Sequence, residues 1–176
     1  MHRRGILTIA MALACVCLVG ANAPEEKARN PFNVEDVADP DGKDVQDFAD
    51  KEKLAGDDKD DNAKQWARVP EGADGKKGSL EGTWDSRWNN TGGDWFPGTA
   101  KVKVIGDRVY ILYKDQGTYL IDAKRKGKRL IGRYVNVDAK EDTSPWVGEI
   151  VDDERIDGVW LSGRWDFRRK LPTKKD

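Results

Sequence analysis

Apolar and polar residues alternate with a period of two from Ala100 to Phe167, and short turn-like segments interrupt the alternation. Successive side chains of a β-strand point to opposite faces, so this pattern predicts strands that each bury one face. Segments such as Gly106-Asp107 and Lys126-Gly127 separate consecutive runs and are typical of tight turns. No long helical pattern lies between the runs, which favours an all-β domain.

The pattern predicts about eight short strands, the first of them around Leu80 to Trp88. The residues expected on the buried face of the other strands are Ala100, Val102, Val104, Val109, Ile111, Tyr113, Tyr119, Ile121, Ala123, Leu130, Gly132, Tyr134, Trp146, Gly148, Ile150, Ile156, Gly158, Trp160, Trp165 and Phe167. Sequential hairpins with one apolar face each favour an up-and-down antiparallel barrel, because closure removes the exposed edges of an open sheet.

A five-residue repeat supports the same fold. The order aliphatic, any residue, Gly, any residue, aromatic occurs at 80–84, 130–134, 156–160 and 161–165. In a strand the three marked positions share one face, and Gly there leaves room for a bulky ring on a strongly curved sheet. Because the last two copies are adjacent, we expect a bulge or a tight turn near Ser162.

Charge is distributed unevenly along the 176 residues, of which 36% are charged, too many for one compact domain of that length. Residues 24–78 hold 16 acidic and 10 basic residues, whereas residues 79–176 hold 19 basic and 16 acidic residues. The first segment is too poor in apolar residues to offset its chain entropy, so we expect a disordered acidic linker with a transient helix over Val45 to Leu54. The opposite net charges predict a loose attraction between linker and domain that salt would screen.

The N-terminus has the pattern of a secretory signal peptide. A positively charged start precedes an apolar run from Ile6 to Gly20, which is short for a membrane-spanning helix. Cleavage after Ala21 is favoured over cleavage after Ala23, which would leave Pro24 directly after the cut. We therefore expect an extracytoplasmic location (secreted, periplasmic or in the cell envelope) and no stable transmembrane segment after processing.

Lipidation is an alternative to free secretion, because Ala12-Leu13-Ala14-Cys15 resembles a degraded lipoprotein box with an acceptor at Cys15. The predicted organisation is a signal peptide at 1–21, a disordered acidic linker at 22–78, a β-barrel domain at 79–170 and a charged tail at 171–176.

Catalysis is not expected. His2, Cys15 and Cys17 are the only His and Cys residues, and all three lie in the predicted signal peptide. Without them the mature chain has no His acid or base, Cys nucleophile, disulfide or Cys/His metal site. The acidic stretches 39–44 and 57–62 lack the spacing of an EF-hand loop, so we expect no metal site and no cofactor.

The domain resembles the calycin group of small barrels, the avidins and lipocalins, over about residues 80–169. The resemblance is carried by Gly82-Thr83-Trp84, by the segment 130–134 and by a closing strand with Trp165 and Arg168. A resemblance in fold does not carry function, and no biotin-binding set of polar residues matches this chain.

The resemblance implies a closed end of the barrel in which Trp84 stacks with Arg168 or Arg169. Gly82, Trp84 and Arg168 are therefore the expected barrel-closing residues.

The segment 88–97 combines glycines, amides and aromatic rings, which is the composition of a loop that binds a sugar, a peptide or an apolar ring. The candidate ligand-binding residues are Trp88, Asn89, Asn90, Asp94, Trp95 and Phe96. In the alternative interpretation, Trp95 and Phe96 simply plug the barrel end. An eight-stranded barrel is just wide enough to be filled by side chains or to hold one small ligand, and the many large inward residues favour a filled interior.

The basic hairpin tip at 124–129 and the acidic segment 152–154 are interpreted as solvated turns. Nucleic-acid binding is not expected, because no stacking rings accompany the basic residues. The sequence thus predicts a secreted or envelope-associated, non-catalytic binding module for a small molecule, a glycan or a protein. The alternative is a structural or inhibitory envelope protein with a solid barrel that acts through protein contacts.

Overall fold

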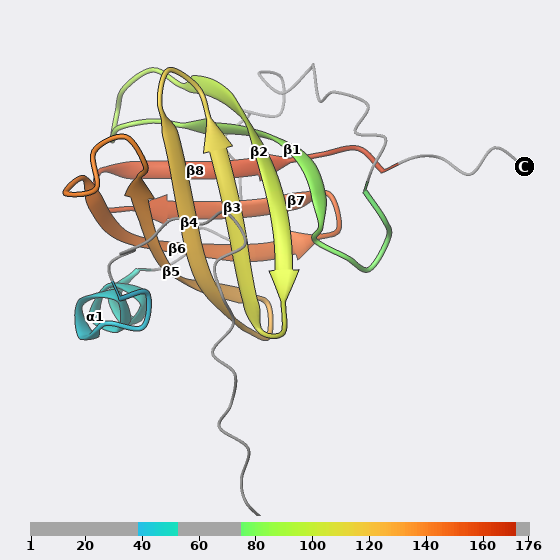
Figure 1. Cartoon of the computed structure of the whole chain (residues 1–176), viewed down its shortest axis with the longest axis horizontal. Helices are drawn as coiled ribbons and strands as arrows, with labels where there is room; N and C mark the ends of the chain where they lie inside the picture. Colours follow the sequence, from blue (N-terminus) through green and yellow to red (C-terminus); the bar gives the residue numbers. More distant parts are fainter. Residues whose placement is uncertain (1–38, 53–74, 172–176) are drawn as a thin grey trace, which may run out of the picture.

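The computed structural model describes residues 39–52 and 75–171, which form one helix and eight strands (Figure 1). The elements are α1 (Lys43–Lys51), β1 (Gly82–Trp88), β2 (Phe96–Ile105), β3 (Arg108–Lys114), β4 (Thr118–Lys126), β5 (Arg129–Asn136), β6 (Thr143–Asp152), β7 (Arg155–Trp160) and β8 (Gly163–Arg168). Each strand pairs antiparallel with its neighbour in sequence, and β8 pairs with β1. The sheet is therefore a closed up-and-down barrel, and the predicted fold class is confirmed.

The buried face predicted from the alternation is also confirmed. The main core cluster consists of Leu80, Trp84, Ala100, Val102, Val109, Ile111, Tyr113, Ile121, Ala123, Leu130, Tyr134, Trp146, Ile150, Ile156, Trp165 and Phe167, with Trp88, Val104, Tyr119 and Trp160 packed against it. The break expected near Ser162 is a tight turn, since Trp160 pairs directly with Gly163. An irregularity of register lies instead between Ile150 and Asp152 on β6.

Two glycines of the barrel wall make room for the ring of Trp146, which is fully buried. A Cβ atom at Gly148 would lie 2.3 Å from Cη2 of that ring. At Gly158 a Cβ atom would lie 2.7 Å from its Nε1 and 2.2 Å from the carbonyl oxygen of Trp165. Gly158 thus accommodates a bulky ring, as the repeat predicts, and so does Gly148, which lies outside the repeat. At Gly132 and Gly163 of the repeat, a Cβ atom would instead meet the carbonyl oxygens of Asp122 at 2.0 Å and of Asn89 at 2.1 Å.

One end of the barrel is closed by Trp84. Its indole Nε1 donates a hydrogen bond of 2.9 Å to the carbonyl oxygen of Leu80, and the guanidinium Cζ of Arg169 lies 4.3 Å from its ring centroid. Trp84 lies in β1, which begins at Gly82, and the positive φ of 126° at this residue suits glycine.

Arg168, the other arginine considered from the sequence, does not make this contact. Trp165 and Phe167 point inward on β8. The alternation therefore places Arg168 on the outer face and Arg169 on the inner face. Arg168 forms an ion pair of 2.9 Å with Asp157. The closing arginine is therefore Arg169.

The helix α1 packs on the outside of the barrel, beside β5 and β6 (Figure 1). Val45 and Ala49 form a small buried cluster with Ile131 and Val147, and Phe48 packs against it. The spacing i, i+3, i+4 places the three helical residues on one face. Part of the segment predicted as a disordered linker is thus ordered, and the helix covers 43–51 rather than 45–54.

The expected attraction between the acidic segment and the basic domain is present in this region. Asp44 pairs with Arg133, and Asp41 pairs with Arg108 at 3.0 Å. Arg129 donates a hydrogen bond of 2.7 Å to the carbonyl oxygen of Ala49, in the last turn of α1. Part of the basic hairpin therefore contacts the helix end, where a positive charge is favourable.

Several predictions concern residues outside those described. The signal peptide at 1–21, the lipid acceptor Cys15, the acidic stretch 57–62 and residues 172–176 belong to this group. Within 39–52 and 75–171, no helix is both long and apolar enough to cross a membrane.

Candidate functional site: an aromatic cavity at one end of the barrel

A cavity of about 150 Å³ lies at the end of the barrel where β1, β5 and β7 finish and β4 and β8 begin. It is lined by Trp88, Tyr119, Tyr134, Asp142, Trp160 and Trp165. An apolar cavity of about 150 Å³ is large enough for a molecule of the size of benzene. The prediction of a filled interior is correct around Trp84 and Trp146, which are at most 1% exposed, but wrong at this end.

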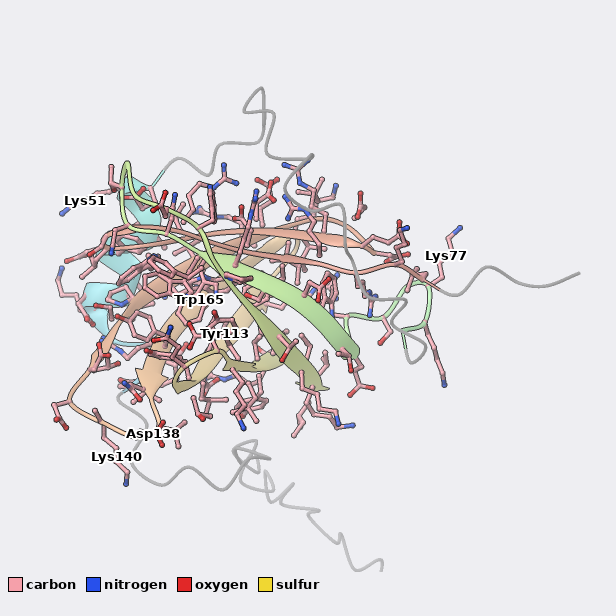
Figure 2. The ribbon with its side chains drawn as sticks, turned by 90° about the horizontal axis from the view of Figure 1, so that it is seen from above. Lys51, Lys77, Tyr113, Asp138, Lys140 and Trp165 are labelled. Carbon is pink, nitrogen blue, oxygen red and sulfur yellow. The ribbon has the colours of Figure 1, made fainter. Side chains whose placement is uncertain are left out.

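Figure 2 shows where this end lies. Tyr113 and Trp165 are inside the barrel, and Lys77 lies toward the opposite end from Asp138 and Lys140. Asp138 and Lys140 belong to the β5–β6 connection, which borders the cavity through Asp142. The cavity is thus at the far end of the barrel from Trp84.

The lining rings contact one another edge to face. The ring of Tyr134 lies 5.7 Å from that of Trp160 and 5.4 Å from that of Trp165, and Trp165 lies 5.7 Å from Tyr119. Trp88 meets Trp160 at 5.9 Å with an interplanar angle of 82°. Such pairs stabilise each other by about 0.5–1.5 kcal/mol beyond their buried area, so the rings hold one another in place.

Asp115 fixes one side of this cluster. Its Oδ2 accepts hydrogen bonds of 2.9 Å from Trp88 Nε1 and from the Tyr113 hydroxyl, and its Oδ1 accepts one from the Gly117 N–H. Burial opposes ionisation of the carboxyl, but these hydrogen bonds outweigh it and lower the pKa of Asp115. Asp115 is therefore a fixed negative charge behind the indole of Trp88.

Asp142 supplies a second carboxylate at the exposed rim. Its Oδ1 lies 3.4 Å from the Tyr134 hydroxyl, and its Oδ2 accepts a hydrogen bond of 3.3 Å from Asn136. Burial, together with the charge of Asp142, raises the pKa of Tyr134 to about 12. Burial also raises the pKa of Tyr119, and every charge that acts on this phenol, from Asp115, Asp142 and Asp138, is negative.

Three of the six residues predicted to bind ligand lie at or beside the cavity. Trp88 lines it, and Phe96, which is 41% exposed, stacks on Trp88 with the ring centroids 4.6 Å apart. Asn89 does not line it but accepts a hydrogen bond of 3.1 Å from Trp160 Nε1 on its carbonyl oxygen. Its side-chain oxygen accepts another of 2.9 Å from the Arg164 N–H, so Asn89 positions Trp160.

The other three predicted residues are elsewhere. Trp95 lies beneath the guanidinium of Arg87, with Cζ 4.0 Å from the ring centroid, on the outer face of the barrel. Asn90 and Asp94 are exposed in the β1–β2 loop and do not line the cavity. Neither Trp95 nor this part of the loop plugs the barrel end.

Sequence reasoning placed Tyr119, Tyr134, Trp160 and Trp165 on the inner face but treated them as core, and it did not single out Asp142. The positions of these four rings along the predicted strands are a sequence signal for this site. In an up-and-down barrel the ends of odd-numbered strands and the beginnings of even-numbered strands meet at one end. Each of these four rings lies within two positions of such a strand end, as does Trp88.

Comparison with protein-family models, with curated proteins and with solved structures gave no match. Within the described ranges, no group of three or more Asp, Glu, His or Cys side chains is arranged to hold a metal ion. The chemistry available at the cavity is that of aromatic surface and carboxylate charge.

Proposed function

We propose that this protein is a non-catalytic binding module that takes a small ligand, or one small group of a larger partner, into the aromatic end of a calycin-like barrel. The observation that carries the proposal is the cavity of about 150 Å³ lined by three tryptophans and two tyrosines. Binding sites for small molecules are concave and mostly apolar, with a few polar groups that orient the ligand. Asp142 is such a group at the rim.

The proposal of a non-catalytic role rests on how the polar groups are engaged. The Asp115 carboxylate already accepts three hydrogen bonds from the protein, and burial raises the pKa values of Tyr119 and Tyr134. A general base needs an accessible lone pair and a pKa near the working pH. These groups are better suited to hold a ligand than to move its protons, and the N-terminal pattern supports an extracytoplasmic setting.

Two tryptophans of the same loop region provide a matched test. Ligand-observed NMR with the full chain would screen neutral, anionic and cationic molecules of the size of benzene, and calorimetry would give affinities. We expect Trp88→Ala, at the cavity, to weaken binding of each hit about tenfold or more, because an aromatic anchor is lost. Trp95→Ala, on the outer face, should change affinity less than twofold.

Equal effects of the two substitutions, or a screen without hits, would refute the proposed site. Far-UV circular dichroism and thermal unfolding would establish that each variant is folded. If Trp88→Ala fails to fold, Tyr119→Leu replaces it, since Tyr119 lines the cavity from β4 and is only partly buried.

A second candidate function, action through protein contacts, is favoured by two exposed apolar side chains at the same end. Phe96 and Leu161 are 41% and 61% exposed. Exposed apolar residues near a rim are typical of contact surfaces. A partner that copurifies with the wild-type chain but not with Leu161→Ser, together with a screen without hits, would favour this alternative.

A further inference from the structure

We infer that the cavity binds a small organic cation of the alkylammonium class; the inference rests on the binding function proposed above. Aromatic rings form five of its six lining residues, and the sixth is the carboxylate of Asp142. The lining includes no lysine or arginine. The cavity therefore offers π surface and negative charge and no positive charge.

Aromatic faces attract cations through the ring quadrupole, and Trp and Tyr do so most strongly. Quaternary ammonium groups are recognised in this way because they are weakly hydrated and have no strong hydrogen-bonding needs. A cation that leaves water also needs a compensating charge nearby. Asp142 at the rim and Asp115 behind Trp88 supply that charge.

The indole N–H groups argue against a sugar or an anion as the ligand. All three lining tryptophans donate their Nε1–H to the protein: Trp88 to Asp115 at 2.9 Å, Trp160 to the carbonyl oxygen of Asn89 at 3.1 Å, and Trp165 to Ser86 Oγ at 3.0 Å. These donors are therefore committed. A sugar or an anion needs converging donors, whereas an alkylammonium group needs none of them.

Electrostatics at the phenols point the same way. The carboxylates of Asp115, Asp142 and Asp138 act on Tyr119, and the carboxylate of Asp142 acts on Tyr134. Each of these carboxylates is a negative charge. A cation entering between these rings would meet an attractive potential, and an anion a repulsive one.

The size of the cavity limits the ligand. A volume of about 150 Å³ corresponds to roughly five water molecules of liquid or one benzene-sized group. Tetramethylammonium or the trimethylammonium head of choline is of this order. A larger molecule would place only its ammonium head in the cavity and leave the rest at the rim.

Isothermal titration calorimetry with the full chain at pH 7 tests the charge requirement directly. The probes are choline and its neutral isostere 3,3-dimethyl-1-butanol, which has the same shape without the charge. We expect choline to bind about tenfold more tightly, since desolvated cation–π contacts are worth about this factor. Phosphocholine distinguishes two sources of the ammonium group. Weaker binding than that of choline indicates a free cation as the ligand, and tighter binding indicates a zwitterionic headgroup.

Two carboxylates at this end of the barrel give matched variants. Asp142→Asn removes the rim charge and should weaken choline binding about threefold to fivefold, while leaving the affinity for the neutral isostere unchanged. Asp94→Asn removes the same charge from the exposed loop and should change neither affinity. Tyr119→Leu should weaken choline binding about tenfold, and Tyr119→Phe, which keeps the ring, should retain most of it.

The outcomes separate this inference from the proposed function. If the isostere binds as tightly as choline, or if only neutral or anionic molecules of the screen bind, the cation inference is overturned and the binding function stands. If no molecule of any charge binds, both fall. If choline binds but Asp142→Asn and Tyr119→Leu leave its affinity unchanged in folded protein, the cation is bound elsewhere and the inference is overturned.

Discussion

The guanidinium group of Arg169 lies over the indole ring of Trp84, with Cζ 4.3 Å from the ring centroid. The same group donates hydrogen bonds of 2.8 Å to the carbonyl oxygen of Glu81 and of 2.6 Å to that of Asp153, and a further one to the carbonyl oxygen of Ser79. The Arg169 side chain therefore connects the segment before β1 and the β6–β7 turn with the Trp84 ring, which closes the barrel.

Substitution of Arg169 should destabilise the barrel strongly. Arg169→Ala should lower the free energy of unfolding by about 3 kcal/mol, because it removes a cation–π contact and leaves three partly buried carbonyl groups without this donor. Arg169→Lys should lower the free energy of unfolding less, since the ammonium group keeps the positive charge. Some loss should remain, because an ammonium group cannot reach three carbonyl groups as the planar guanidinium group does. Urea unfolding followed by tryptophan fluorescence measures both.

The control for Arg169 is its exposed neighbour Lys170. Lys170→Ala should change the free energy of unfolding by less than about 0.5 kcal/mol. Equal losses for Arg169→Ala and Lys170→Ala would contradict the assigned closure.

Gly158→Ala should also destabilise the fold, by about 2 kcal/mol or more. The added methyl group would lie 2.2 Å from the carbonyl oxygen of Trp165 and 2.7 Å from the Trp146 ring, so backbone or ring must move. Gly93→Ala serves as control, because its nearest neighbour would lie at 3.2 Å in an exposed loop. Thermal unfolding measures the stability of both variants. A Gly158→Ala variant as stable as the wild type would show that the barrel wall is less tightly packed than described.

The docking of α1 can be tested by hydrogen exchange. Val45 is fully buried against the barrel, so Val45→Asp would place a carboxylate in an apolar contact and should release the helix. Amides of residues 43–51 should then exchange at least tenfold faster while those of β5 and β6 stay protected. Asp50→Asn on the exposed side should leave exchange unchanged, and equal exchange in Val45→Asp and wild type would disprove the docking.

Asp85 makes stability depend on pH. Burial raises the pKa of Asp85 to about 6, and its Oδ2 has no hydrogen-bond partner among the described residues. A raised pKa means that the folded state binds the proton more tightly than the unfolded state, whose pKa is near 3.8. The contribution of Asp85 to stability is therefore fully present below pH 3.8 and is lost as the pH rises to about 6.

Asp85→Asn should remove this dependence. Relative to wild type, the variant should gain about 1–2 kcal/mol between pH 4 and pH 7, an amount that allows for partial screening by solvent. Urea unfolding at several pH values measures the difference. Exposed Asp94→Asn is the control, and a gain that is the same for both variants, or the same at every pH, would contradict the assignment to Asp85.

The barrel wall could be predicted from sequence because its pattern is local. Alternation from Ala100 to Phe167 identified the inner face, and the glycine repeat marked Gly158, one of the two glycines that leave room for a bulky ring. Both follow from the pleat of a strand, which puts every second side chain on the same face whatever its partner is.

The site and the docked helix could not be predicted to the same degree, because each depends on residues distant in sequence. Periodicity showed that Tyr119 and Trp160 face inward, but not that these rings leave a cavity, which depends on how side chains from five strands share one end. Composition suggested a linker around Val45, whereas an apolar patch of Ile131 and Val147 on the outer wall gives that short helix a place to pack.

The sequence by itself thus determined the strands, their inner face and the closure of the sheet, since these follow from side-chain alternation and short turns. Only the tertiary structure decided which arginine covers Trp84 and which aromatic residues border open space. It also decided that Trp95 lies outside the barrel while Trp88 lies at the cavity. The physical reason is that packing depends on the volumes and directions of side chains brought together from distant segments, and a linear pattern carries neither.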